Sequence, residues 1–231
     1  SLVTLTALAR LSKFYQKPFK VAAITVETGV PGMSFDAVAD YCAALGVEYI
    51  RANVPIYEIV FLERKEKNPC SLCAKLRRGA LSTAMNEHGI KTIALGHHYD
   101  DVIETILMGM LHGAQIQTMM PKLHSTNYPG MELIRPLYLV REDDIKAWRD
   151  YNGLHFIQCA CKFTDTCTTC NDGQNHSKRQ ETKELIRELK KSNPDVEKCI
   201  FSSVENVNID TVLAYKKNGI KHSFLDDYDS K

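Results

Sequence analysis

Apolar residues in this chain gather in short continuous runs, and each run is followed by a segment in which apolar positions recur at helical spacing. Such runs are typical of strands buried on both faces of a parallel sheet. The runs predict strands at 21–26, 47–52, 91–96 and 133–134. The helical spacing predicts helices at 2–15, 34–45, 69–88, 100–111 and 142–151. This alternation predicts an α/β fold, a Rossmann-like parallel sheet with helices on both faces.

Capping signals mark the ends of two of these helices. Ser34 and Gly46 are expected to cap the second helix at its start and end. Asn68 has the character of an N-cap, Pro69 of a first helical residue, and Gly89 of the residue that ends the same helix.

The pattern changes near residue 155. A cysteine-rich, polar segment follows, and then the spacing is purely helical, with helices expected at 177–191 and 195–204. We therefore expect two parts: an α/β domain at 1–155, and a cysteine-containing segment with a helical C-terminal extension at 156–231.

Composition narrows the class of protein. The chain has 231 residues, 44% of them hydrophobic, and a formal net charge of +1, which argues neither for nor against nucleic acid. No apolar run approaches membrane-spanning length, and the start lacks a basic signal-peptide region, so we expect a cytoplasmic protein without a membrane partner. CxxC pairs among the eight cysteines then favour reduced thiols over disulfides.

The first cysteine pair is well placed for chemistry. Cys70 and Cys73 lie three residues apart on the expected first turn of a helix, so they share one face. The helix dipole and the nearby Arg77 and Arg78 favour thiolates there. Such a pair is half of a metal or iron–sulfur site. The other half is expected among four later cysteines: Cys159, Cys161, Cys167 and Cys170.

A polar segment follows the third predicted strand, where open α/β sheets bind their ligands. Gly96 would let a ligand approach the backbone, and His97, His98, Asp100 and Asp101 follow it at a helix N-terminus. The carboxylates could hold Mg²⁺ on a nucleotide or transfer a proton. The alternative is that Asp100 or Asp101 simply caps the helix.

Five longer motifs resemble one known family. They are PCSLCAKLRRG, ALGHHYDDVIETILMGMLHG, MMPKL, IRPLYLVREDDI and SVENV, in order over about residues 66–210. They are similar to the TtcA-type tRNA 2-thiocytidine synthetases of the PP-loop, or N-type ATP pyrophosphatase, superfamily. The resemblance implies the PP-loop ATPase fold, ATP with Mg²⁺, and a tRNA substrate.

The resemblance also implies a [4Fe-4S] cluster held by three cysteines. Cys70 and Cys73 match the first two, and Cys159 is favoured as the third, with Cys161 as the alternative. The open iron would carry the sulfur, supplied by a cysteine desulfurase or by sulfide. Cys167 and Cys170 are not part of the family pattern. They are either a pair of zinc ligands or loop thiols without a metal. The remaining two, Cys42 and Cys199, are expected in the core.

A second departure concerns the phosphate loop. Members of the superfamily carry a strand and the motif SGGKDS, whereas this sequence starts at Ser1, which matches only the last serine. We expect the strand and the glycines upstream of Ser1. The alternative is a degenerate module that does not bind the ATP phosphates normally.

The implied reaction adenylates the C2 oxygen of a tRNA cytidine and replaces it with sulfur. Asp100 is the catalytic candidate. The residues expected at ATP are Ser1, Val26, Gly96, Asp100 and Asp101. Those expected at tRNA are Arg77, Arg78, Lys178 and Arg179, the alternative being ordinary solvated helix faces. Three other outcomes stay open: a PP-loop relative thiolating another tRNA base or substrate, a zinc-structured nucleotide-binding protein, and a homodimer.

Overall fold

The computed structural model describes residues 1–64, 69–126, 128–154, 178–226 and 228. The chain divides into two compact units. The first unit comprises residues 1–101 and 120–175, and the second comprises residues 102–119 and 176–231.

The first unit contains the α/β sheet that the apolar runs predicted. Its strands are β1 (Ala22–Glu27), β2 (Glu48–Asn53), β3 (Thr92–Ala94), β4 (Lys122–His124) and β5 (Glu132–Ile134). The pairs β1–β2 and β3–β5 are parallel, which confirms the predicted topology for these strands. The short β4 runs antiparallel to β5 and was not predicted. Among the described residues, hydrogen bonds join the strands as β1–β2 and as β3–β5–β4.

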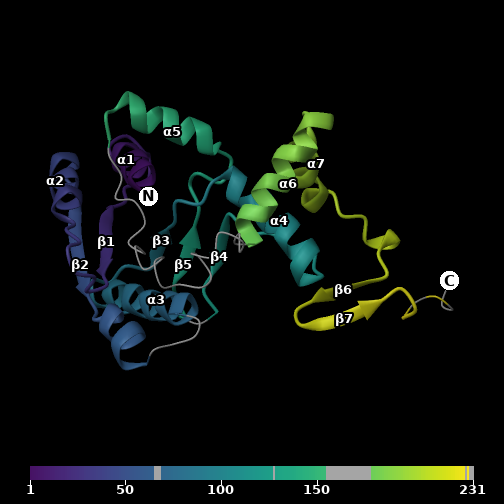
Figure 1. Ribbon diagram of the computed structural model, residues 1–231, viewed down its shortest axis with the longest axis horizontal. Helices are drawn as coiled ribbons and strands as arrows, with labels where there is room; N and C mark the ends of the chain where they lie inside the picture. Colours follow the sequence, from purple (N-terminus) through teal and green to yellow (C-terminus); the bar gives the residue numbers. More distant parts are fainter. Residues whose placement is uncertain (65–68, 127, 155–177, 227, 229–231) are drawn as a thin grey trace. The chain divides into compact units, whose positions relative to one another are not determined.

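Helices of the first unit flank these strands (Figure 1). They are α1 (Leu2–Leu11), α2 (Asp36–Leu45), a short π-helix (Glu58–Glu63), α3 (Pro69–Glu87) and α5 (Glu142–Tyr151). The long α3 contacts both β1 and β2, α2 contacts β2, and α1 lies beside α5. The sheet and its helices therefore bring the ends of β1, β2 and β3 and the start of α1 into one unit.

Most predicted boundaries hold to within two residues. The helix α5 has the predicted bounds, and α3 begins at Pro69 as expected. Gly46 and Gly89 end their helices with φ of 68° and 64°, the left-handed conformation that glycine adopts without strain. Ser34 accepts a hydrogen bond from the amide of Asp36, but the N-cap of α2 is Phe35, so the N-cap expected at Ser34 was wrong by one residue. The predicted N-cap Asn68 lies outside the described residues.

One expected helix was wrong in extent, and one short helix was not expected. The first helix ends at Leu11 rather than continuing to residue 15. Its buried side chains are Thr4, Thr6 and Ala9. The π-helix at Glu58–Glu63 was not predicted. Its Val60, together with the preceding Ile56, is almost fully buried, which stabilises this turn by about 1.5–3 kcal/mol per side chain.

The second unit is helical, with a small hairpin after it. It contains the part of α4 (Tyr99–Gly113) after Asp101, and α6 (Lys178–Ser192), α7 (Val196–Glu205), a 3₁₀ turn (Ile209–Thr211), β6 (Ala214–Lys217) and β7 (Ile220–Ser223). The three helices lie within two residues of their predicted bounds. Val102, Ile103 and Ile106 form the buried face of α4. The hairpin was not predicted. In the described part of the chain, no helix is long and apolar enough to cross a membrane.

Candidate functional site

The loop between β3 and α4 is held by a capping interaction at the start of α4. The backbone N–H of His98 donates a hydrogen bond to the carboxylate of Asp101, 3.1 Å away. His98 directly precedes Tyr99, the first residue of α4, so Asp101 reaches back to it from the third helical position, as in a capping box. For Asp101 the capping role that the sequence left open is therefore the observed one.

The neighbouring carboxylate, Asp100, is bound to the start of α5 and to the N-cap residue of that helix, Arg141. It accepts a hydrogen bond from the backbone N–H of Glu142 at 2.7 Å and pairs with the guanidinium of Arg141 at 3.0 Å. Burial alone would raise the pKa of Asp100, but His98, the Glu142 N–H and the Arg141 charge lower that pKa to about 2. Asp100 is therefore a firmly ionised anchor and, with such a pKa, a weak base.

His98 lies against both carboxylates. Its Nδ1 is 3.6 Å from Asp100 and its Nε2 is 3.4 Å from Asp101, and 15% of its side chain is exposed. Burial would lower the pKa of His98, but the charges of Asp100, Asp101 and Glu142 outweigh it and raise that pKa above the usual 6.5. The imidazole therefore holds a proton more firmly than a free histidine does, beside two anions at the sheet edge.

Arg141 and Arg135 complete the edge. The guanidinium of Arg141 lies 5.2 Å from the centre of the Tyr99 ring, a cation–π arrangement. Arg135, after β5, donates from Nε to Nδ1 of His97 at 3.3 Å and also hydrogen-bonds the carbonyl of Met120. These arginines were not singled out from the sequence, although both stand in the motif IRPLYLVREDDI. The motif therefore contained both arginines, but it did not indicate which groups they contact.

Gly96 brings the end of β3 against the start of α1. A Cβ at this position would lie 2.9 Å from the backbone nitrogen of Ser1, 3.2 Å from its Cα and 3.3 Å from Oγ1 of Thr4. Ser1 makes no side-chain capping bond to α1. The hydroxyl of Thr4 is buried and has no hydrogen-bond partner among the described residues. Two predicted ATP residues, Ser1 and Gly96, thus meet at a helix N-terminus, where amides favour phosphate.

A cavity of about 320 Å³ opens beyond the ends of β1 and β2. Its wall includes the apolar Met33 and Phe35 and the polar Glu27 and Asn53. This volume lies in the range of small-molecule sites. Val26, expected at ATP, is in β1 next to Glu27 and is not part of the wall.

Two acidic groups are bound near this cavity by a single arginine. Arg51 pairs with Glu27 and lies 3.2 Å from Asp36. It therefore holds the end of β1 to the start of α2.

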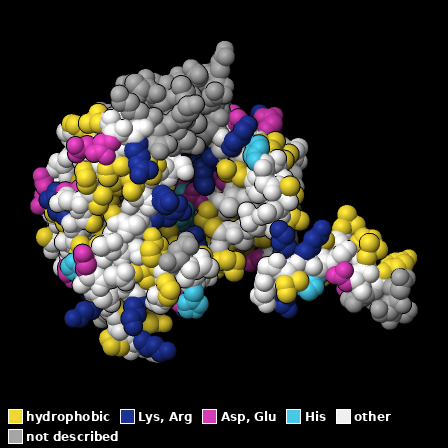
Figure 2. Space-filling view, turned by 90° about the horizontal axis from the view of Figure 1, so that it is seen from below, with side chains coloured by type: hydrophobic (Ala, Val, Ile, Leu, Met, Phe, Trp, Pro, Cys, Tyr) yellow, Lys and Arg dark blue, Asp and Glu magenta, His cyan; other side chains and the backbone are white. Residues whose placement is uncertain are grey.

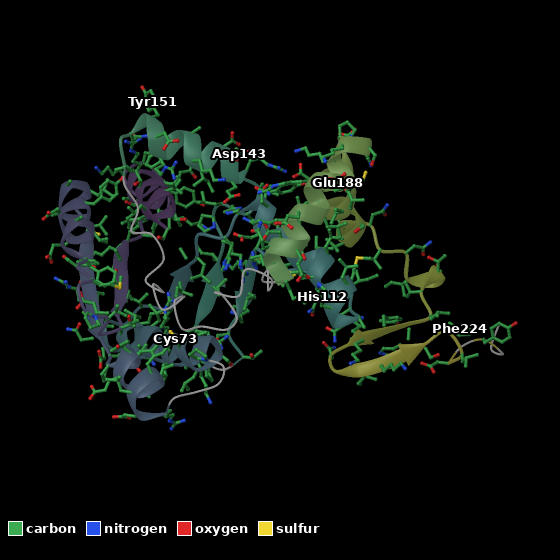
Figure 3. All side chains as sticks on the ribbon, in the orientation of Figure 1. Cys73, His112, Asp143, Tyr151, Glu188 and Phe224 are labelled. Atoms are coloured by element: carbon green, nitrogen blue, oxygen red, sulfur yellow. The ribbon has the colours of Figure 1, made fainter. Side chains whose placement is uncertain are left out.

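The cysteine pair sits in the first turn of α3. Cys70 and Cys73 both belong to this helix, and Cys73 is a half-buried free thiol (Figure 3). Arg77 and Arg78 are exposed one turn later on the same helix. The later cysteines lie outside the described residues: Cys159, Cys161, Cys167 and Cys170. Within the described residues alone, no three potential ligands come together.

The two other cysteines have different surroundings. Cys42 is fully buried in α2, and burial raises the pKa of its thiol, so its expected core position is confirmed. Cys199 is exposed on α7, so the core position expected for it was wrong. Its helix turns it outward because Ile200 and Val204 occupy the less exposed positions.

The cations expected at tRNA on α6 already have partners in the protein. Lys178 pairs with Glu181 on the surface at 2.9 Å. Arg179 pairs at 2.8 Å with Glu104 of α4, whose side chain is only 3% exposed, and Lys183 lies 3.5 Å from the same carboxylate. Elsewhere Lys and Arg side chains stand at several separate places on the face shown in Figure 2. Arg179 therefore has a structural role whether or not it touches RNA.

The fold and this sheet edge can be compared with known proteins. The model of the PP-loop domain family matches residues 1–165. The chain belongs to the PP-loop family. The resemblance inferred from the motifs is thereby confirmed, as is the α/β fold class.

Individual relatives sharpen the assignment within the PP-loop family. A tRNA-cytidine(32) 2-sulfurtransferase of Pseudomonas fluorescens (strain Pf0-1) is 32% identical over 208 residues, which cover 90% of this chain and 72% of that protein. The protein of the same name from Vibrio vulnificus (strain YJ016) is 34% identical over 208 residues, 90% of this chain and 64% of that protein. This PP-loop protein is thus a member of the tRNA-cytidine 2-sulfurtransferase group.

A solved structure shows the same fold. It is the U34-tRNA thiolase NcsA from Methanococcus maripaludis with its [4Fe-4S] cluster, which matches with a TM-score of 0.64 and 22% identity over 90% of this chain and 71% of that one. The shared fold alone does not determine the substrate, because one fold can support several functions.

Proposed function

We propose that this PP-loop protein is an ATP-dependent tRNA sulfurtransferase that replaces the C2 oxygen of a cytidine with sulfur. The observation that carries the proposal is the identity of about one third, over 90% of the chain, to proteins named for that reaction at cytidine 32. We propose the same nucleotide here. A base in a tRNA loop is accessible because it is not confined in a duplex.

The chemistry explains why ATP is needed. A ring carbonyl oxygen is a poor leaving group, and transfer of AMP to it, with release of pyrophosphate, makes it a good one. The start of α1 at Ser1, facing Gly96, is our proposed phosphate contact, and the cavity beyond β1 and β2 is our proposed place for the nucleoside. Mg²⁺ would supply neutralisation of the phosphate charges when bound.

The roles of Asp100 and Asp101 follow from their contacts. Asp101 caps α4, and Asp100 anchors the start of α5. We propose that the part of Asp100 in the reaction is to present a fixed negative charge at the sheet edge, beside His98, rather than to accept a proton. Its catalytic role stays a prediction, and so does the place of Val26 and Asp101 at ATP.

The cysteine pair on α3 fits a [4Fe-4S] cluster in its donor chemistry. Cys70 and Cys73 share the first turn, Cys73 carries a free thiol, and soft sulfur ligands select iron. We propose these two with Cys159, or alternatively Cys161, as the three protein ligands. The cluster would supply an open iron that carries the sulfur to be transferred.

Partners follow from the same proposal. The substrate is tRNA, with the exposed Arg77 and Arg78 beside the cysteine pair as our proposed contacts. Lys178 and Arg179 remain weaker candidates because both are already paired. The sulfur would come from a cysteine desulfurase or from sulfide, in the cytoplasm. A homodimer stays a prediction.

The decisive experiment uses the full-length protein purified without oxygen. Iron, acid-labile sulfide and zinc are measured for wild type, Cys73→Ser and the matched control Cys199→Ser, which alters an exposed thiol on α7. We expect about four iron and four sulfide per chain in wild type and control, and loss of both in Cys73→Ser. Circular dichroism checks that all three fold. Stoichiometric zinc without iron would overturn the sulfur chemistry and support the zinc-structured alternative.

Nucleoside digests then test the substrate. tRNA from cells with and without the gene is digested, and 2-thiocytidine is measured. We expect it to disappear without the gene and to return with Cys199→Ser but not with Cys73→Ser. Loss of a different thionucleoside would mean that the substrate is another base and not cytidine.

A further inference from the structure

The hairpin at residues 214–223 stands apart from every role assigned so far. β6 and β7 pair antiparallel through a two-residue turn at Asn218 and Gly219 (Figure 1). These residues have φ of 53° and 81°, and two positive φ values are what the tight turns favoured between antiparallel strands require. The turn therefore fixes the register of the strands.

The register sets two lysines against each other. Lys216 lies directly opposite Lys221. Like charges at opposite positions of an antiparallel pair destabilise it. No Asp or Glu occurs in residues 214–223, and in the described part of the chain Lys216, Lys217 and Lys221 form no ion pair. An anion bound between the two lysines would relieve the repulsion.

The other face of the hairpin carries an aromatic pair. Tyr215 lies opposite His222, with ring centres 4.9 Å apart and planes within 17° of parallel. Lys217 and Ile220 are the next pair on that face. Stacked rings with a nearby cation form a platform on which unpaired bases stack in RNA-binding proteins.

The hairpin is also exposed. All four residues of β6 are exposed, and Ile220 of β7 is 63% exposed. A two-stranded hairpin that buries so little is only marginally stable in water, so a binding partner would add to its stability. The net charge of the whole chain is only +1, so attraction for a polyanion must come from local groups such as this one.

We infer that the β6–β7 hairpin is an RNA-binding arm that holds the tRNA phosphate backbone between Lys216 and Lys221 and stacks an unpaired base on the Tyr215–His222 pair. The inference rests on the proposed function for the identity of the RNA. Nucleic acid fits better than a protein surface, because the strands combine three lysines with no acidic residue. β-ribbons are an established means of contacting nucleic acid.

The test measures anisotropy of a labelled tRNA transcript with the full-length protein over a range of salt. The variant Lys216→Ala/Lys217→Ala/Lys221→Ala is compared with Lys13→Ala/Lys17→Ala/Lys20→Ala, which removes the same charge from exposed positions after α1. We expect the hairpin variant to weaken binding about tenfold to a hundredfold and to reduce the salt slope by about 2, with little change in the control. Tyr215→Ala should weaken binding about tenfold without changing the slope.

Equal affinity of the two triple variants, both folded by circular dichroism, would overturn the inference. So would a change of oligomeric state on gel filtration with tRNA affinity intact, because the hairpin would then be a protein interface. The proposed function fails separately: if wild-type protein makes no 2-thiocytidine while the hairpin variant still loses affinity for tRNA, the arm stands and the reaction does not.

Discussion

A single glycine, Gly96, sets how closely β3 approaches α1. We expect Gly96→Ala to destabilise the protein by about 1–3 kcal/mol, because the new Cβ would lie 2.9 Å from a backbone nitrogen that cannot rotate away. Gly79→Ala is the matched control, since nothing lies within 4 Å of its Cβ position in α3. The helix preference for alanine should stabilise that variant by up to about 1 kcal/mol.

Urea unfolding followed by circular dichroism measures both glycine variants. Equal stability of Gly96→Ala and wild type would mean that the end of β3 has room for a side chain. Its glycine would then be explained by a bound ligand rather than by packing on α1.

At the scale of single residues, the sequence locates the polar loop between β3 and α4 but does not predict the hydrogen bonds that its side chains form. Two adjacent carboxylates at a helix start are visible from the sequence, and so are the roles open to them. Which one caps the helix depends on the backbone path at His98. The partner of Asp100, the amide of Glu142, is distant in sequence, so only the folded sheet brings it near. The same holds for Arg135 and His97.

At the scale of elements, one buried carboxylate of α4, Glu104, pairs with two cations of α6. We expect Arg179→Ala to destabilise the protein by about 2–3 kcal/mol, because it removes the nearer cation from a side chain that is 3% exposed. Lys178→Ala, one residue earlier, removes only a surface pair with Glu181 and should cost less than about 1 kcal/mol.

The same variants separate stability from RNA contact. Denaturant unfolding measures the stability of the two variants. The contact with RNA is measured by tRNA binding at a temperature where both variants are folded. If Arg179→Ala were as stable as Lys178→Ala but bound tRNA less well, its pairing with Glu104 would be incidental and its contact with RNA would be the main role.

Elements differed in how far the sequence could predict them. Long segments with strong spacing, such as α5, came out with the right bounds. The three-residue β4 has no such spacing, and its antiparallel pairing with β5 depends on the folded chain. The β6–β7 hairpin was missed although Asn218-Gly219 between strand-like residues is a strong turn signal. The roles of Cys159, Cys161, Cys167 and Cys170 remain predicted from the sequence alone, because these residues lie outside the described part of the chain.

At the scale of the whole molecule, α4 belongs to both compact units. Its first three residues, Tyr99 to Asp101, lie in the first unit, and the rest lies in the second. Three residues cannot form a stable helix by themselves, because helix nucleation is unfavourable and only the hydrogen bonds of a longer segment offset its cost. If the second unit unfolds, the first turn of α4 should therefore unfold with it. Asp100 and Asp101 would then lose the geometry that binds the first unit's own segments.

This predicts that the two units unfold together. The chain has one tryptophan, Trp148 in α5, so its fluorescence reports on the first unit, while far-ultraviolet circular dichroism also reports on α6 and α7. Arg179 and its partner Glu104 both lie in the second unit. We expect it to lower the thermal midpoint by both probes and by the same amount, because the loss is transmitted through α4. A fluorescence midpoint that stays at the wild-type value while the dichroism midpoint falls would show that the first turn of α4 holds without the rest of the helix.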